Sequence, residues 1–239
     1  SSLVVFGTLE GKYEEAETLY KRSLAIDEKV YGPDHLEVAT DLNNWAGLLR
    51  AQGNNAEAEP LYARSQAIRE KVLGPKHPDV ATTLNDRAGL LMSQGKYAEA
   101  EPLYERCQAI YEKALGPEHP HVATVLNNRA GLLSAQGKYA EAQPLFERAL
   151  AIREGALGVD HPDTITSRAW MADLYKKQGF LDKASPLLEE VVSARERVQG
   201  RDHPDVASAL NSRAGLLKAQ GKYAEAEPLY ERSMSGERR

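Results

Sequence analysis

Residues 77–118 read HPDVATTLNDRAGLLMSQGKYAEAEPLYERCQAIYEKALGPE, the most regular copy of a unit that recurs along the chain. Equivalent residues of successive copies are 42 positions apart. A fixed period of this length is typical of repeat architectures, in which each unit stacks only on its neighbours. Five histidines and six glycines recur at this 42-residue spacing: His35, His77, His119, His161, His203, Gly11, Gly53, Gly95, Gly137, Gly179 and Gly221.

Each copy reads as two helices joined by a short turn. We expect a first helix with Pro78 at its first position, ending at Gly95, because glycine accepts the left-handed backbone at a helix end. The second helix is expected from Tyr97 to Leu115. Short loops fold such helices into antiparallel hairpins, and stacked hairpins form an all-α solenoid. Prolines recur inside the second helix, where they predict either a bend or a helix that begins only near the proline: Pro60, Pro102, Pro144, Pro186 and Pro228.

The unbroken period predicts one solenoid over residues 1–239, with no separate domains. In the first unit only the tail of a first helix precedes Gly11, where a turn is expected. The predicted units are a partial repeat at 1–34, repeats at 35–76, 77–118, 119–160 and 161–202, and a truncated last repeat at 203–239.

The composition narrows the class of protein. Hydrophobic residues make up 42% and charged residues 27% of 239 residues, values close to those of globular proteins. No apolar run approaches the ~18 residues of a membrane span and no signal peptide opens the chain, so we expect a cytoplasmic protein without membrane contact. The single cysteine, Cys107, fits a reducing compartment and is expected to be a packing residue. A net charge of −5 argues against nucleic acid as a partner.

Catalytic and metal-binding chemistry is not indicated. An enzyme needs one unlike site, whereas this chain consists mostly of copies and contains no phosphate loop or hydrolase motif. Equivalent histidines on helices packed 8–10 Å apart cannot share a zinc ion, whose ligand nitrogens lie ~2.0–2.1 Å from the metal. We therefore expect no enzyme activity, metal or cofactor, and expect each histidine to close the loop before the next helix.

One face of the first helix is small and polar. At 100° per residue, Thr124, Asn127 and Gly131 fall on one side of the helix that follows His119, opposite its apolar stripe. An asparagine amide both donates and accepts hydrogen bonds, so this face is suited to holding a peptide backbone in a groove. The alternative is that each asparagine bonds its own turn or a neighbouring helix. The predicted groove residues are Asn43, Asn85, Asn127 and Asn211, with Thr82 and Thr124.

Specificity is expected from positions on this face that differ between copies. They are Arg50, Met92, Ser134, Lys176 and Lys218. Three of the five are basic although the chain is acidic, which favours a ligand with acidic character. Ordinary solubilising surface is the alternative.

A second set of positions conflicts with the apolar stripe. Arg87, Arg129 and Arg213 fall within it, and a buried arginine needs a partner. Each of these hairpins has a glutamate ten residues past its turn glycine. The sequence therefore predicts ion pairs inside each hairpin, namely Arg87–Glu105, Arg129–Glu147 and Arg213–Glu231.

The turn and second helix carry a resemblance to a known family. Gly-Lys-Tyr at 95–97, 137–139 and 221–223 is followed by Ala100, Ala142 and Ala226, then by an aromatic four residues on in each copy. This pattern is similar to the tetratricopeptide repeat (TPR), and the recurring HPDVA-x-x-LNN-x-AGLL and AIREK-x-LGPxHP resemble its kinesin light chain type. The resemblance covers nearly the whole chain.

The resemblance implies a right-handed superhelix whose inner groove, lined by first helices, binds peptide segments of partner proteins. The resemblance is also compatible with a second function. Similar arrays occur in STAND-type signalling ATPases, so this chain could be the ligand-sensing array of a larger protein of that type. A self-associating structural array, stacked end to end, is a further possibility. A nucleic-acid-reading helical repeat is opposed by the net charge.

Overall fold

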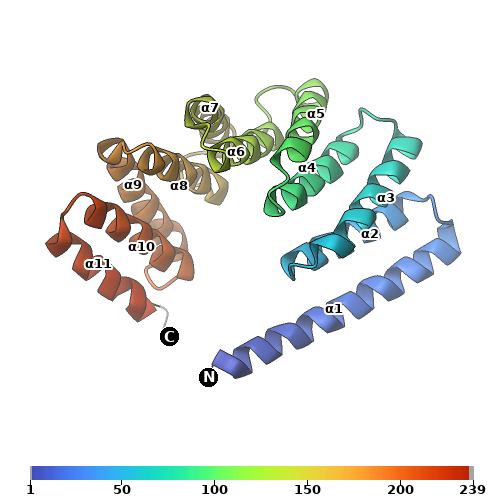
Figure 1. The fold of residues 1–239 in the computed structure, drawn as a ribbon, viewed down its shortest axis with the longest axis horizontal. Helices are drawn as coiled ribbons and strands as arrows, with labels where there is room; N and C mark the ends of the chain where they lie inside the picture. Colours follow the sequence, from blue (N-terminus) through green and yellow to red (C-terminus); the bar gives the residue numbers. More distant parts are fainter. Residues whose placement is uncertain (1, 237–239) are drawn as a thin grey trace. The chain divides into compact units, whose positions relative to one another are not determined.

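The computed structural model describes the backbone of residues 2–236 and the side chains of residues 12–234. Over the described residues the chain is all helical, as predicted, and contains no strand (Figure 1). Residues 1 and 237–239 of the predicted first and last repeats lie outside the described residues. The helices are α1 (Ser2–Tyr31), α2 (Leu36–Ala51), α3 (Asn55–Leu73), α4 (Pro78–Ser93), α5 (Tyr97–Leu115), α6 (Pro120–Ala135), α7 (Tyr139–Leu157), α8 (Pro162–Lys177), α9 (Leu181–Gln199), α10 (Pro204–Ala219) and α11 (Tyr223–Gly236).

Local signals set the helix ends. His77 caps α4, because its Nδ1 accepts a hydrogen bond from the backbone N–H of Asp79 at 3.2 Å, and Pro78 is the first helical residue. Gly95 has φ +73°, and the next N–H, that of Lys96, returns to the carbonyl of Leu91 at 2.9 Å. The predicted role of the histidine in closing the loop is confirmed. The prediction that the first helix ends at the glycine is confirmed as well.

The hairpins are α2–α3, α4–α5, α6–α7, α8–α9 and α10–α11. Each of α4, α8 and α10 contacts the second helix of its own hairpin and that of the preceding one. The chain divides into two compact units, Ser1–Pro117 with α1–α5 and Glu118–Arg239 with α6–α11. Within a unit, every first helix that follows a hairpin is therefore enclosed between two second helices.

The core joins neighbouring hairpins through small and aromatic side chains. Ala130 of α6 and Ala142 of α7 are fully buried and let their two helices approach. Phe146 fills the remaining space and packs with Met171 and Leu174 of the next first helix, α8. A hairpin thus completes its core only with its neighbour, which is the physical basis of a stacked array.

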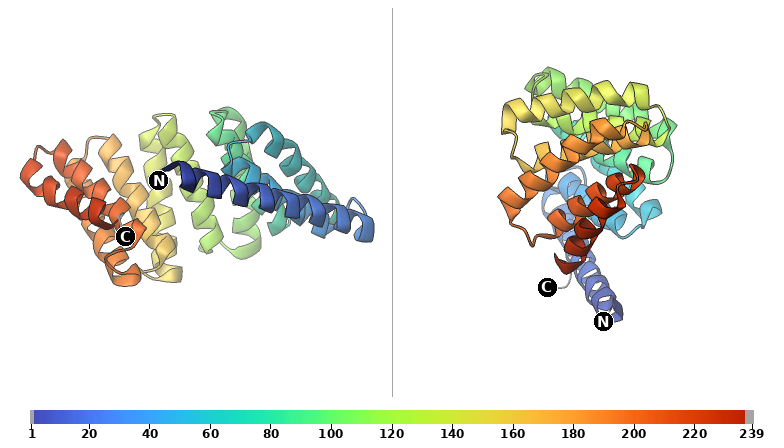
Figure 2. Two further views of the ribbon diagram at one scale, coloured as in Figure 1. Left: turned by 90° about the horizontal axis from the view of Figure 1, so that it is seen from below. Right: turned by 90° about the vertical axis from the view of Figure 1, so that its left-hand side faces the viewer.

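Two expectations about helix boundaries are wrong. The turn expected at Gly11 does not form, because α1 runs without a break from Ser2 to Tyr31 (Figure 1, Figure 2). Glycine inside a helix costs only about 1 kcal/mol relative to alanine, so Gly11 can continue the helix. The alternative that the second helix begins only near its proline is also wrong, since α5 begins at Tyr97 and contains Pro102.

Candidate functional site

The first helices carry the predicted asparagine ladder, and the structure uses two of its members to join hairpins. Asn43 is only 9% exposed, and its Nδ2 donates to Oδ2 of Asp86 on the next first helix at 2.9 Å. Asn127 is fully buried, and its Nδ2 donates to Oγ of Ser167 at 2.6 Å. Both amides face a neighbouring first helix, which agrees with the alternative that the asparagines bond within the scaffold, and their contact with a peptide stays a prediction.

The other two asparagines differ in exposure. Asn85 is partly buried, whereas Asn211, on α10, is exposed. Their peptide contacts stay a prediction. With Asn43 and Asn127 buried, the four amides do not form one continuous binding row.

The predicted threonines also contact the scaffold. Oγ1 of Thr82 lies 2.8 Å from Oη of Tyr111 on α5, and Oγ1 of Thr124 accepts from Nη2 of Arg153 at 3.0 Å. Each hydroxyl additionally donates to the carbonyl four residues earlier in its own helix. These contacts tie the first helix to the second helix of the same hairpin.

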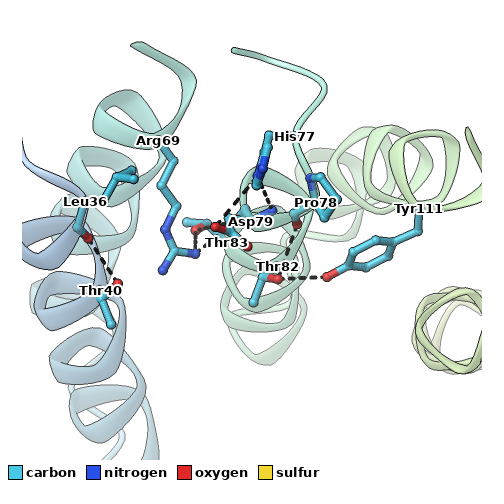
Figure 3. A network of polar contacts seen from close by, with 9 residues as sticks. All are labelled: Leu36, Thr40, Arg69, His77, Pro78, Asp79, Thr82, Thr83 and Tyr111. Carbon is cyan, nitrogen blue, oxygen red and sulfur yellow. Dashed lines mark hydrogen bonds and ion pairs between the residues drawn. The ribbon is translucent and has the colours of Figure 1, made fainter. Parts of the chain in front are cut away.

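A set of buried arginines on the second helices was missed by the sequence analysis. Figure 3 shows Arg69 reaching from α3 to α4, where its Nη1 donates to the carbonyl of Asp79 at 2.9 Å and to Oγ1 of Thr83 at 2.8 Å. Arg153 repeats this arrangement one unit on, with the carbonyl of Asp163 at 2.9 Å and Oγ of Ser167 at 2.8 Å.

Burial lowers the pKa of both Arg69 and Arg153, while the neighbouring aspartates Asp79 and Asp163 act against that shift. The signal that could have revealed them is the recurrence of Ala-Ile-Arg-Glu at 67–70 and 151–154, which sets an arginine beside a buried isoleucine.

The predicted ion pairs within hairpins are wrong for Arg87 and Arg213. Nη2 of Arg87 lies 2.6 Å from Oε1 of Glu59 on α3, the second helix of the preceding hairpin. Arg213 likewise pairs across hairpins, with Glu189 on α9 at 2.9 Å. A first helix lies between two second helices, and these positions face the earlier one, so Glu105 and Glu231 are not the partners.

The third predicted pair, Arg129–Glu147, stays a prediction. Glu147 accepts a hydrogen bond from Nε2 of Gln143 at 2.8 Å within α7.

The positions expected to give specificity fall into two groups. Arg50, Lys176 and Lys218 are exposed, and Met92 is partly buried. Ser134 is only 7% exposed, so it offers little to a ligand.

Arg50 also lies close to the next first helix. Its Nη1 is 3.4 Å from the carbonyl oxygen of Asp86. A Cβ atom at Gly89 would lie 2.6 Å from that nitrogen, so glycine makes this approach possible.

Two further features bear on chemistry. Cys107 is fully buried, burial raises the pKa of its thiol, and its Sγ lies 3.1 Å from the carbonyl oxygen of Ala81.

Within the described residues, no three His, Cys, Asp or Glu side chains are grouped as around a metal ion. No helix of the described part of the chain combines the length and apolar character of a membrane span.

Comparison with known proteins gives consistent matches. A family model described as "Tetratricopeptide repeat" matches residues 8–44, 39–91, 79–155, 121–169 and 163–236. No curated protein matches the sequence.

Solved structures are similar over most of the chain. BtubC (BKLC) from P. vanneervenii is 20% identical, with a TM-score of 0.81 over 94% of this chain and 91% of that one. The nearly identical TPR-like repeats of a putative kinesin light chain from Podospora anserina are 28% identical, with a TM-score of 0.72 over 85% of this chain and 96% of that one. A tetratricopeptide repeat protein from Parabacteroides merdae is 21% identical, with a TM-score of 0.62 over 96% and 75% of the two chains.

Proposed function

The chain belongs to the tetratricopeptide repeat family, and on this premise we propose that it is a non-catalytic scaffold that binds an acidic, extended segment of a partner protein. The segment contacts the carboxyl-terminal ends of the first helices, where the exposed basic residues lie. The buried asparagines Asn43 and Asn127 hold hairpins together and do not contribute.

The observation that carries this proposal is the pair Lys176 and Lys218. They occupy equivalent positions of consecutive hairpins, at the ends of α8 and α10, and both are exposed. Among the described residues neither lysine forms an ion pair, whereas the neighbouring Lys177 pairs with Asp173 at 2.8 Å. Two unpaired cations in register on adjacent units favour a ligand with regularly spaced negative charges.

The repeat geometry sets the spacing of those charges. Packed helices lie about 8–10 Å apart, and an extended chain advances about 3.3 Å per residue. Carboxylates three residues apart in an extended segment are therefore about 10 Å apart, and we take this as the spacing that bridges two consecutive hairpins. The expected ligand pattern is Glu-x-x-Glu.

Fluorescence anisotropy with a labelled Glu-x-x-Glu peptide tests this proposal. The control peptide has the same composition with its glutamates adjacent to one another. Exposed ion pairs contribute about 0.2–1 kcal/mol each, so reversing both lysines (Lys176→Glu with Lys218→Glu) is expected to weaken binding about tenfold. Lys76→Glu combined with Lys113→Glu, at two exposed lysines outside the α8–α9 and α10–α11 hairpins, is the matched control that reverses the same number of charges.

Salt dependence separates charge recognition from apolar contact. The affinity is expected to fall as the salt concentration rises from about 50 to 500 mM. An affinity indifferent to salt, to glutamate spacing and to the two lysines would refute the proposed function.

A second candidate, association with another copy of the chain, is supported by the apolar face of α1. Leu19, Ile26 and Val30 are 59%, 50% and 63% exposed. The equivalent of Ile26 in the next hairpin, Ile68, is only 3% exposed because it packs in the core that includes Val38 of its own first helix. Within the described part of the chain this apolar stripe of α1 stays exposed, so it is open to a second copy.

Sedimentation velocity over a range of concentrations tests this second candidate. Concentration-dependent dimers that Ile26→Glu abolishes would support it. A monomer at every concentration would refute it and would leave peptide binding unaffected.

A further inference from the structure

The hairpin α8–α9 departs from the repeated pattern around its inner turn. Tyr175 stands where other hairpins have leucine, at Leu49, Leu91, Leu133 and Leu217. Phe180 stands where they have Lys12, Lys96, Lys138, Lys222 or Asn54. Lys183 reverses the charge of a glutamate present in every other copy, at Glu15, Glu57, Glu99, Glu141 and Glu225.

These three divergent residues come together in space. Nζ of Lys183 lies 5.0 Å from the ring centroid of Phe180 and 5.5 Å from that of Tyr175. The ammonium group is thus held against two aromatic rings, an arrangement that is favourable for a cation. Glutamate at this position would be repelled by both ring faces, so the aromatic and basic substitutions depend on one another.

The turn itself does not require Phe180. Its φ and ψ angles are −81° and 62°, against −82° and 58° for Lys96 and −80° and 58° for Lys138. Its N–H bonds the carbonyl of Tyr175 at 2.8 Å, as Lys96 bonds Leu91 at 2.9 Å. None of these side chains caps the following helix. The turn forms equally with lysine, and yet Phe180 leaves 47% of its surface exposed.

Phe180 borders a cleft of about 530 Å³ between two consecutive turns. Leu181 and Lys183 line it from the α8–α9 turn, and Gln220 and Lys222 line it from the α10–α11 turn. Among the described residues Lys183 and Lys222 form no ion pair. The cleft therefore combines an exposed aromatic ring with cations on both sides.

We propose that this cleft, between Phe180, Lys183 and Lys222, is a specificity pocket that receives an apolar side chain of the acidic segment. The inference rests on the proposed function, because Lys176 and Lys218 precede the same two turns. The apolar side chain covers Phe180, and carboxylates beside it face Lys183 and Lys222. A protein segment can supply both the apolar side chain that covers Phe180 and the carboxylates that face Lys183 and Lys222, and nucleic acid is an outcome that the test distinguishes.

The array itself supplies the variant that removes the pocket. Phe180→Lys combined with Lys183→Glu restores the residues that the turn of α6–α7 already carries, so the fold is expected to persist. Circular dichroism and the thermal midpoint check this for each protein. The double substitution shifts the net charge by only one unit, from −5 to −6, which keeps long-range electrostatics comparable.

The probes are two labelled Glu-x-x-Glu peptides, one with leucine and one with serine between the glutamates, and a labelled single-stranded oligouridine. We expect the wild-type protein to bind the leucine peptide about fivefold more tightly than the serine peptide, and the double variant to bind both alike. Equal binding of the two peptides by the wild type, or a leucine preference that survives in the double variant, overturns the pocket. Tighter binding of oligouridine than of either peptide also overturns it.

The same titrations separate failure of the pocket from failure of the proposed function. If Lys176→Glu with Lys218→Glu weakens binding of both peptides while the double variant at the turn changes neither, the pocket is refuted and the proposed function stands. If the wild-type protein binds neither peptide, the proposed function fails, and the pocket fails with it.

Discussion

Nδ2 of Asn127 donates a 2.6 Å hydrogen bond to Oγ of Ser167, and this contact joins α6 to α8. Arg153 donates to the same oxygen from α7 at 2.8 Å. One buried hydroxyl thus connects three helices of two hairpins. Asn127 and Ser167 thus fix how one hairpin sits on the next, and the proposed ligand contacts lie at exposed positions of the first helices such as Lys176 and Lys218.

Asn127→Ala is expected to destabilise the protein, whereas Asn211→Ala is not. Loss of a buried hydrogen bond costs about 1–2 kcal/mol, while the exposed Asn211 should change the free energy of unfolding by less than about 0.5 kcal/mol. Urea unfolding followed by circular dichroism compares the two variants. Equal losses of stability would contradict the structural role of Asn127.

Arg69→Met tests the buried arginine on α3. Arg69 bonds both a carbonyl and a hydroxyl of the next helix, so its loss is expected to cost about 2–3 kcal/mol. Arg195 is more exposed and donates to the carbonyl of Asp205 at 2.7 Å, so Arg195→Met should cost about 1 kcal/mol. Thermal unfolding gives the comparison. A smaller loss of stability for Arg69→Met than for Arg195→Met would argue against a role of Arg69 in joining α3 to α4.

Asp41 predicts a pH dependence of stability. Burial raises its pKa above the usual 3.8, and the nearby carboxylates of Asp27 and Glu37 raise it further, against a lowering hydrogen bond from Ser23. A raised pKa in the folded state means that the stabilising contribution is present below the ordinary pKa and is lost as pH rises through the raised value. The thermal midpoint should therefore fall as the pH rises from the ordinary pKa of 3.8 through the raised pKa of Asp41, and Asp41→Asn should remove this fall.

Asp34 gives the control of opposite sign. The hydrogen bond from Lys71 lowers the pKa of Asp34, so its contribution is lost as pH falls. Asp34→Asn should leave the Asp41 transition in place. An unchanged pH profile for Asp41→Asn would show that this carboxyl does not control the transition.

Cys107 should be unreactive in the folded protein. Its side chain is fully buried and its raised pKa disfavours the thiolate, which is the reacting species. A thiol reagent such as iodoacetamide is expected to modify it only at the rate at which the surrounding hairpins open. Rapid modification at neutral pH without denaturant would contradict this packing role.

The sequence predicts the helices well because their ends depend on local signals. His77, Pro78 and Gly95 act within a few residues of the chain, and their equivalents act alike in most copies, although α2 begins at Leu36 where the other first helices have proline. Gly11 is the exception, because α1 continues through it from Ser2 to Tyr31 although the local signal is that of a turn.

The site is less predictable because it depends on neighbouring hairpins. A helical wheel separates the face of Asn127 from the apolar stripe, but it does not show whether that face meets solvent or another helix. It likewise places Arg87 toward the interior without deciding between the two second helices that flank it. Phe180 and Lys183 are visible as departures once the copies are compared, but only the structure brings them to one cleft.

The central claim is that positions which differ between hairpins bind the partner, while positions shared by the hairpins hold the array together. An NMR titration of isotope-labelled protein with the leucine-containing Glu-x-x-Glu peptide tests this claim most directly. The account predicts chemical shift changes at residues 176–183 and 218–222, with the side-chain amide of Asn127 unaffected. Changes at Asn127 with no response from residues 176–183 would contradict it.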